Sequence, residues 1–273
     1  GNPAPPHPRP TQGKPEALKV EWELYRLTPM GLFSSIIHVF ATDIPRLSRV
    51  LDEVLATHGF VRSASSRVPP AGPQALHDLI GHAGERPTYA LNASGTRWAT
   101  IIEVSFAVEN APWIAEVANQ LSRELRTYCL CMVLHDDDVF LYNLDHCGES
   151  LDGYNSNPQY FEEAALSREE IEDQRHSPDA FAPLLPAATS VDELRALLHA
   201  GWWTAYDAGR LDSDGVPVDD EWPFDTEGER MTRFGTLLGL AGESLSYPFT
   251  AWAEATQVPW QDFTAVQYSV RAV

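Results

Sequence analysis

The chain has 273 residues, which suits one large or two modest domains, and 44% of them are hydrophobic, which excludes a wholly disordered protein. It holds 19 Lys and Arg against 39 Asp and Glu, a formal net charge of −20. Because such a surface repels nucleic-acid phosphates and anionic lipid headgroups, we expect no nucleic acid and no membrane among its partners. Basic proteins, cations and neutral ligands remain compatible with this charge.

The first region, residues 1–29, has the composition of a disordered arm. Six prolines lie within its first 15 residues, with almost no apolar side chains to bury. Such a segment favours a solvated, partly polyproline-II conformation. Met30 stands just before the first strand-like run, which makes it a candidate for the natural start of the chain.

Two later segments share one pattern that predicts a duplicated β-α-β unit. Each begins with an Ile-Ile-x-Val strand, at residues 36–40 and 101–106, and continues through an Asx residue and a proline into a helix and a second strand. Apolar residues recur on one face of each helix. They are Leu47, Val50, Leu51, Val54 and Leu55 in the first helix and Ile114, Val117, Leu121 and Leu125 in the second.

The predicted fold class is α/β (α+β), with both units in one ferredoxin-like antiparallel sheet at residues 30–156. Each helix has a single apolar stripe, which a common sheet face can bury. Residues 88–92 and 98–106 are typical of a hairpin in that sheet. Turns at residues 135–138 and 147–148 then extend the sheet by a further hairpin.

Residues 157–273 have the pattern of a helical C-terminal region packed on the sheet. Asn157-Pro158 is a typical helix start, and capping boxes begin at Ser190 and Thr226. Each capping box precedes an apolar stripe, and the region is rich in aromatic residues. The sequence therefore predicts an arm, a sheet domain and a helical part in chain order.

The densest polar segment, His135 to Tyr160, supplies the candidate binding site. We expect the hairpin that follows residue 139 to return Asp152 to the sheet end where the Asp136 turn lies, since adjacent strands are about 4.8 Å apart. Clustered carboxylates repel one another unless a cation or a basic partner lies among them. The candidate partner-binding residues are Asp136, Asp137, Asp138, Asp152, Asn155, Asn157 and Tyr160.

The block Leu-Asp-Gly-Tyr-Asn-Ser-Asn-Pro-Gln-Tyr-Phe at residues 151–161 resembles one in a family of uncharacterised bacterial proteins. Members of that family also tend to begin Met-Gly-Leu-Phe, the sequence of residues 30–33. The resemblance extends over residues 30–165 and implies a cytoplasmic α/β domain. It implies no particular reaction.

Other kinds of site find less support in the sequence. A metal could bind the His, Cys and Asp residues of 135–160, but turn and cap chemistry explains them, so we expect no metal and no cofactor. Residues 210–221 have the spacing of a calcium loop with Arg210 at the first ligand position, where a cation opposes binding. No nucleophile elbow and no phosphate-binding loop is present.

The three cysteines favour a reducing compartment. Their number is odd, and they show no zinc-site or disulfide-framework spacing. We interpret Cys129 and Cys131 as small buried hydrophobic residues. Because no apolar stretch is long enough to cross a bilayer, we expect a cytoplasmic protein.

These features together predict a non-catalytic acidic protein-binding module, of the kind that serves as an immunity or inhibitor-type partner of a basic protein. Its charge would steer association with such a partner. Two alternatives remain open at this point. One is an enzyme with a metal or acid-base site around residues 135–160, and the other is a small-molecule sensor.

Overall fold

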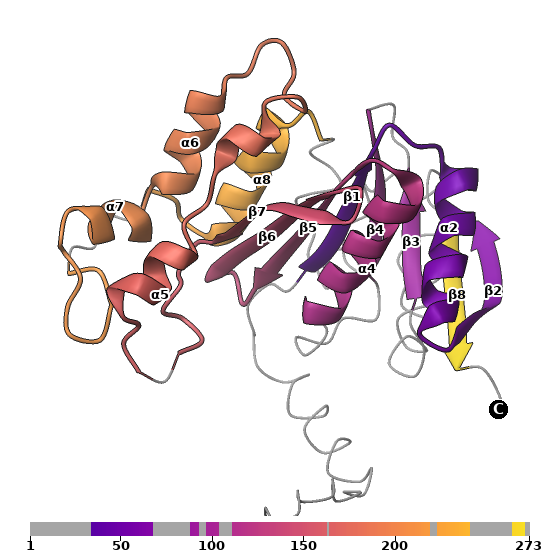
Figure 1. Ribbon diagram of the computed structural model, residues 1–273, viewed down its shortest axis with the longest axis horizontal. Helices are drawn as coiled ribbons and strands as arrows, with labels where there is room; N and C mark the ends of the chain where they lie inside the picture. Colours follow the sequence, from indigo (N-terminus) through magenta and orange to yellow (C-terminus); the bar gives the residue numbers. More distant parts are fainter. Residues whose placement is uncertain are drawn as a thin grey trace, which may run out of the picture. The chain divides into compact units, whose positions relative to one another are not determined.

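The computed structural model describes residues 34–67, 88–92, 97–103, 111–162, 164–218, 223–240 and 264–270, all within one compact unit at residues 32–273. It is a mixed α+β fold around an eight-stranded antiparallel sheet (Figure 1). The strands are β1 (Ser34–Phe40), β2 (Phe60–Arg67), β3 (Thr88–Asn92), β4 (Trp98–Glu103), β5 (Tyr128–His135), β6 (Val139–His146), β7 (Glu149–Asn155) and β8 (Thr264–Val270). The predicted disordered arm, residues 1–29, lies outside the described residues.

The strand order is β2-β8-β3-β4-β1-β5-β6-β7, which places both predicted β-α-β units in one sheet. Strands β4 and β5 flank β1, and both pair with it antiparallel. Three strands, β4, β3 and β8, separate β1 from β2 in the first unit. The simple four-stranded ferredoxin-like order is therefore not found, because the β3–β4 hairpin and β8 widen the sheet on that side.

Helices α2 (Ile44–Thr57) and α4 (Ala111–Leu125) cover one face of this sheet. Helix α2 begins as its sequence predicts, since the side chain of Asp43 accepts a hydrogen bond from the Arg46 N–H at 2.8 Å and Pro45 lies in the first turn. Both predicted apolar stripes are buried, with Leu51 and Leu121 fully enclosed. The strands contribute alternate residues to this core, as the two-residue period of a strand requires.

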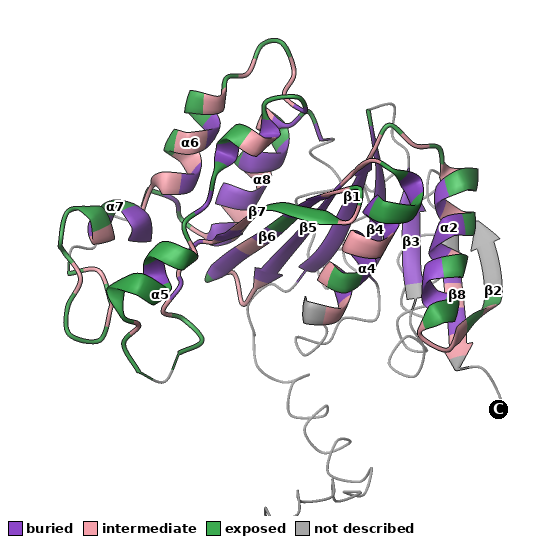
Figure 2. Ribbon diagram, viewed as in Figure 1, coloured by how far each residue is buried: buried purple, intermediate pink, exposed green. Residues whose placement is uncertain are grey.

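The opposite face packs against the helices that follow β7. These are α5 (Arg168–Asp173), the 3₁₀ helix η2 (Pro178–Phe181), α6 (Val191–His199), α7 (Trp202–Asp207) and α8 (Glu227–Leu237). Their apolar residues share a core with the side chains of β5, β6 and β7 that point away from α4. Strands β5 and β6 are consequently buried along much of their length (Figure 2).

The C-terminal part differs from the helical region that the sequence predicts at 157–273. Strand β8 pairs with both β2 and β3, so residues beyond 157 complete the sheet instead of forming only a helical layer. The sequence of this strand alternates between apolar and polar residues, which is the pattern of a strand. In the structure Val266 and Tyr268 are buried, while Gln267 and Ser269 are partly exposed. Asn157 begins a turn, and the next helix starts at Ser167 with a capping box that the sequence analysis missed.

No helix in the described ranges combines the length and the apolar character that a membrane span requires.

Candidate functional site

Asp136 and Asp137 form the tight turn between β5 and β6. Both have positive φ, 54° and 62°, and the Asp138 N–H donates to the His135 carbonyl at 3.0 Å. This is the geometry of a two-residue hairpin turn in which both central residues are left-handed, a conformation that Asp tolerates better than most residues. The predicted turn is therefore confirmed.

Asp137 also caps helix α8, which lies about ninety residues further along the chain. Its Oδ1 accepts from the Gly228 N–H at 3.1 Å, and its carbonyl accepts from the Glu227 N–H at 3.0 Å. A carboxylate at a helix N-terminus satisfies free N–H groups and opposes the helix dipole. A Cβ on Gly228 would lie 2.6 Å from Asp137 Oδ1, so the close approach depends on glycine. The carboxylate of Asp137 is thus engaged within the fold.

We expect Asp137→Gly to lower the free energy of unfolding by about 0.5–2 kcal/mol, because it removes this cap and keeps the positive φ favourable. Chemical denaturation would measure the change. Asp136→Gly is the matched control, since it lies in the same turn and in the same backbone region. Equal losses in the two variants would show that the turn, and not the cap, is what matters.

Asp152 does not lie beside this turn, so that part of the sequence prediction is wrong. The β6–β7 hairpin turns at residues 147–148, which places Asp152 opposite Leu144 in the middle of the strand pair. Its buried carboxylate accepts from Tyr142 Oη at 2.7 Å and from the Ser177 N–H at 2.6 Å. Burial raises the pKa of Asp152, and these hydrogen bonds oppose that rise. Asp152 anchors the segment before η2.

Asn155, Asn157 and Tyr160 do return toward the turn. The Asn155 side chain accepts from the Asn157 N–H at 2.9 Å, and the Asn157 carbonyl accepts from the Tyr160 N–H at 3.1 Å. The resulting bend brings Tyr160 Oη to 3.3 Å from Asp138 Oδ2. The His135 ring lies edge-on to Tyr160, with 5.7 Å between the ring centroids. Of the predicted site, the structure therefore joins Asp138 with Tyr160.

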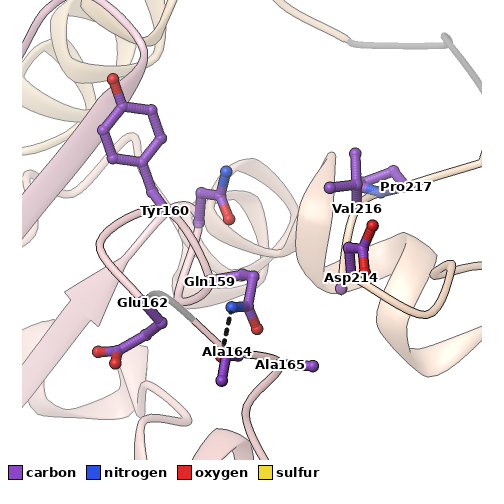
Figure 3. Close-up of a pocket in the computed structure, with 10 residues that line it drawn as sticks. Gln159, Tyr160, Glu162, Ala164, Ala165, Asp214, Val216 and Pro217 are labelled. Carbon is purple, nitrogen blue, oxygen red and sulfur yellow. Dashed lines mark hydrogen bonds between the residues drawn. The ribbon is translucent and has the colours of Figure 1, made fainter.

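An open cavity of about 430 Å³ lies beside this bend (Figure 3). One wall is the segment from Asn157 to Ala165, and the other is the loop from Asp214 to Pro217. The first wall is held by the Gln159 amide, which donates to the Ala164 carbonyl and accepts from the Leu166 N–H, each at 2.9 Å. Nothing in the sequence indicates that these two segments meet.

Hydrogen bonds from Trp202 and within the loop itself hold the second wall in place. Trp202 Nε1 donates to the Gly215 carbonyl at 3.1 Å, and Asp212 Oδ1 accepts from the N–H groups of Asp214 and Val216, each at 2.9 Å. Gly215 has φ +78°, and a Cβ there would lie 2.8 Å from Gln159 Oε1. This arrangement agrees with an ordinary acidic loop, in which the Asp212 carboxylate is used by the backbone.

Exposed apolar side chains and carboxylates line the cavity, as Tyr160, Glu162, Asp214 and Val216 do, or adjoin its lining residues, as Asp138, Phe161 and Val218 do. Tyr160 is 37% exposed, Phe161 50%, Val216 53% and Val218 65%. Asp138, Glu162 and Asp214 are exposed beside them. The ten residues that line the cavity include Glu162 and Asp214 but no Lys, Arg or His. We call these seven residues, Asp138, Tyr160, Phe161, Glu162, Asp214, Val216 and Val218, the acidic rim.

The carboxylates of residues 135–160 are spread over both faces of the sheet. Asp145 accepts from Asn119 Nδ2 of α4 at 2.9 Å, whereas Asp152 faces the helices after β7. Within the described residues, no three His, Cys, Asp or Glu side chains are placed to hold a metal ion. Cys129 and Cys131 are buried, and burial raises the pKa of both thiols. The carboxylates of Asp145 and Asp152 therefore do not converge on one face of the sheet.

Three titratable side chains with shifted pKa values are buried outside the cavity and the acidic rim. The sequence analysis did not predict that they are buried. Burial lowers the pKa of His38 to about 3 and that of His176 to about 4, and it raises the pKa of Glu103 to about 8. His38 hydrogen-bonds Thr100 at 3.0 Å, and the His176 ring lies edge-on to Tyr154 and Trp203. For His38 and Glu103, the available signal was a polar residue at a strand position whose neighbours are apolar.

Comparison with known proteins adds no assignment, since no protein-family model, no curated protein and no solved structure matches the chain. The resemblance of residues 151–161 to an uncharacterised bacterial family therefore stays a prediction.

Proposed function

We propose that the chain is a non-catalytic, acidic protein-binding module that acts in the cytoplasm as an immunity or inhibitor-type partner of a basic protein. The acidic rim is the proposed binding surface. The observation that carries this proposal is the position of the exposed apolar residues. Of the six exposed large hydrophobic side chains in the described residues, four belong to the rim. Apolar patches ringed by polar groups are typical of protein interfaces.

The negative charge of the acidic rim favours a basic protein as the binding partner. Apolar side chains such as Phe161 and Val216 can supply favourable desolvation at the centre of a contact, while Asp138, Glu162 and Asp214 attract cationic groups around it. Both lysines of the chain, Lys14 and Lys19, precede the described residues. The net charge of −20 therefore favours fast, salt-sensitive association with a basic protein.

We also interpret the two β-α-β units as an enlarged ferredoxin-like duplication with a C-terminal helical part. The split unit β4-α4-β5 supports the first, and the shared core of β5–β7 with α5–α8 supports the second. A small-molecule sensor is the second candidate function, because a cavity of about 430 Å³ lies within the range of ligand pockets.

Binding to arrayed peptides would test the proposed function. The peptides pair lysine or arginine with leucine or phenylalanine, and a second set replaces the basic residues by glutamine. We expect the chain to select the basic set, and Phe161→Ser with Val216→Ser to weaken binding by about fivefold or more, since both side chains are exposed and contribute contact area. Glu162→Gln with Asp214→Asn should flatten the salt dependence.

The matched control for the charge change is Glu53→Gln with Glu124→Gln, which removes two exposed carboxylates from α2 and α4. This variant should bind the basic peptides nearly as the original chain does. Equal losses of peptide affinity in both charge variants would show that net charge alone accounts for the effect and that the acidic rim is not the binding site. No preference for the basic set would overturn the proposal.

A further inference from the structure

Three aromatic side chains pack against one another where β5 ends and the bend after β7 returns to it. The rings of His135, Tyr160 and Phe161 lie with 5.0–5.7 Å between their centroids, and each pair is inclined at 73–78°. Tyr160 and Phe161 are both exposed. Figure 3 shows the Tyr160 ring pointing away from Asp214 and Val216 on the other wall of the cavity. We call His135, Tyr160 and Phe161 the aromatic cluster.

An exposed carboxylate lies beside this cluster. Tyr160 Oη donates to Asp138 Oδ2 at 3.3 Å, and Asp138 is exposed. Among the described residues, no arginine or lysine forms an ion pair with Asp138, and none lies over the ring of Tyr160 or Phe161. This surface therefore presents aromatic rings and a negative charge together, without a cation from the described part of the chain.

A second tyrosine–carboxylate pair in the same chain has the same arrangement with a cation in place. Tyr206 Oη donates to Glu172 Oε1 at 3.1 Å, the contact that Tyr160 makes with its own carboxylate. There the guanidinium carbon of Arg175 lies 5.8 Å from the centroid of the Tyr206 ring and 5.0 Å from that of Trp203. Arg175 Nε also lies 2.8 Å from Glu172 Oε2. One arginine thus lies over two rings and pairs with the carboxylate that the tyrosine contacts.

From this correspondence we infer that the aromatic cluster and Asp138 receive one arginine side chain of the basic partner, with its guanidinium over Tyr160 or Phe161 and paired with Asp138. This inference rests on the proposed function and adds the anchor residue to it. A planar guanidinium can stack on a ring and donate to a carboxylate at once, whereas the ammonium of lysine acts as a point charge. Burial lowers the pKa of His135 against the opposing effect of the neighbouring aspartates, so its ring is neutral at pH 7.5 and does not repel the cation.

The cluster itself provides the reporter for a direct test. The His135 ring lies against both Tyr160 and Phe161, so its NMR resonances respond to a guest on those rings. Assignment by His135→Asn would distinguish these resonances from those of the other histidines. The probes are N-acetylargininamide and N-acetyllysinamide at pH 7.5, with the citrulline derivative as a neutral control that has nearly the shape of arginine.

We expect saturable shifts of the His135 resonances with the arginine probe, at the millimolar affinity of a single side chain, weaker binding of the lysine probe and none of citrulline. Phe161→Leu keeps an apolar side chain but removes the ring, and it should weaken binding of the arginine probe by about two- to fivefold. Asp138→Asn should weaken it by a similar factor, because the ion pair is lost. Glu53→Gln, which removes one exposed carboxylate from α2, is the matched control and should leave it unchanged.

Three results would overturn the inference. They are equal binding of the arginine and citrulline probes, equal binding of the arginine and lysine probes, and arginine binding that Phe161→Leu and Asp138→Asn leave unchanged. Failure of the anchor is distinguishable from failure of the proposed function. If arginine and lysine peptides bind equally well and both depend on Phe161 and Val216, the acidic rim stands as a binding surface without an arginine anchor.

Discussion

Replacing Arg230 by methionine should lower the free energy of unfolding by about 3–5 kcal/mol, because it leaves a buried carboxylate without its cation. Arg230 is fully buried on α8, with its Nε 2.9 Å from Glu227 Oε2. Its Nη1 also donates to the carbonyls of Leu197, Leu198 and Ala200 at 2.9–3.3 Å. These carbonyls belong to the C-terminal end of α6, where a cation opposes the helix dipole. One side chain thus joins two helices.

The control for this variant is Arg233→Met on the same helix. Arg233 is exposed and pairs with Glu229 four residues earlier, so its loss should cost less than about 1 kcal/mol. Urea denaturation of both variants would measure the difference. A second variant, Arg230→Met with Glu227→Leu, should recover part of the loss because no unpaired charge remains. If the two single variants unfold alike, the buried pair does not hold the helices together.

Glu103→Gln should raise the free energy of unfolding at pH 7 by about 3 kcal/mol and leave it nearly unchanged near pH 4. Burial raises the pKa of Glu103 to about 8, so the folded protein keeps this proton after the unfolded chain has lost it. Stability from this group is fully present below the ordinary carboxyl pKa and is lost as pH rises toward 8. Glutamine cannot ionise, so it avoids that loss.

Denaturation of the original chain and the variant at each pH would test this expectation. The comparison at equal pH cancels the effect of His38 and His176, whose lowered pKa values remove stability in the opposite direction, as pH falls below about 6.5. Glu53→Gln on the surface of α2 is the matched control and should show no pH-dependent gain. A gain of the same size at pH 4 and pH 7 would show that Glu103 is not a neutral buried acid.

The local elements could be predicted from the sequence because their signals lie within a few residues. The apolar stripes of α2 and α4, the Ser190 capping box and the turn at Asp136 and Asp137 each depend on neighbours along the chain. The presence of β1 and β4 in one sheet also followed, since two helices with one apolar stripe each need a common face. Strand β8 was missed because its short alternating pattern stands alone near the end of the chain.

The candidate site could be predicted only in part, since proximity in sequence is a poor guide to shared surface. Asp152 is close to Asn155 in the chain, yet its side chain is buried against the segment before η2 and holds Ser177. In the sequence Asp137 cannot be distinguished from the aspartates on either side of it, but in the structure it caps α8. The second wall of the cavity comes from residues 214–217, which the sequence presented only as part of a loop with calcium-like spacing and a cation at the first ligand position.

The sequence by itself determined the composition, the negative charge and the local helices and strands, because each depends on residue identity and on spacing within a few turns. Tertiary structure alone decided which carboxylates stay in solvent, which cap a helix and which are buried. That choice depends on contacts such as Asp137 with Gly228, which join segments about ninety residues apart. Burial and pairing set the energy of a charged side chain, and both are properties of the packed fold.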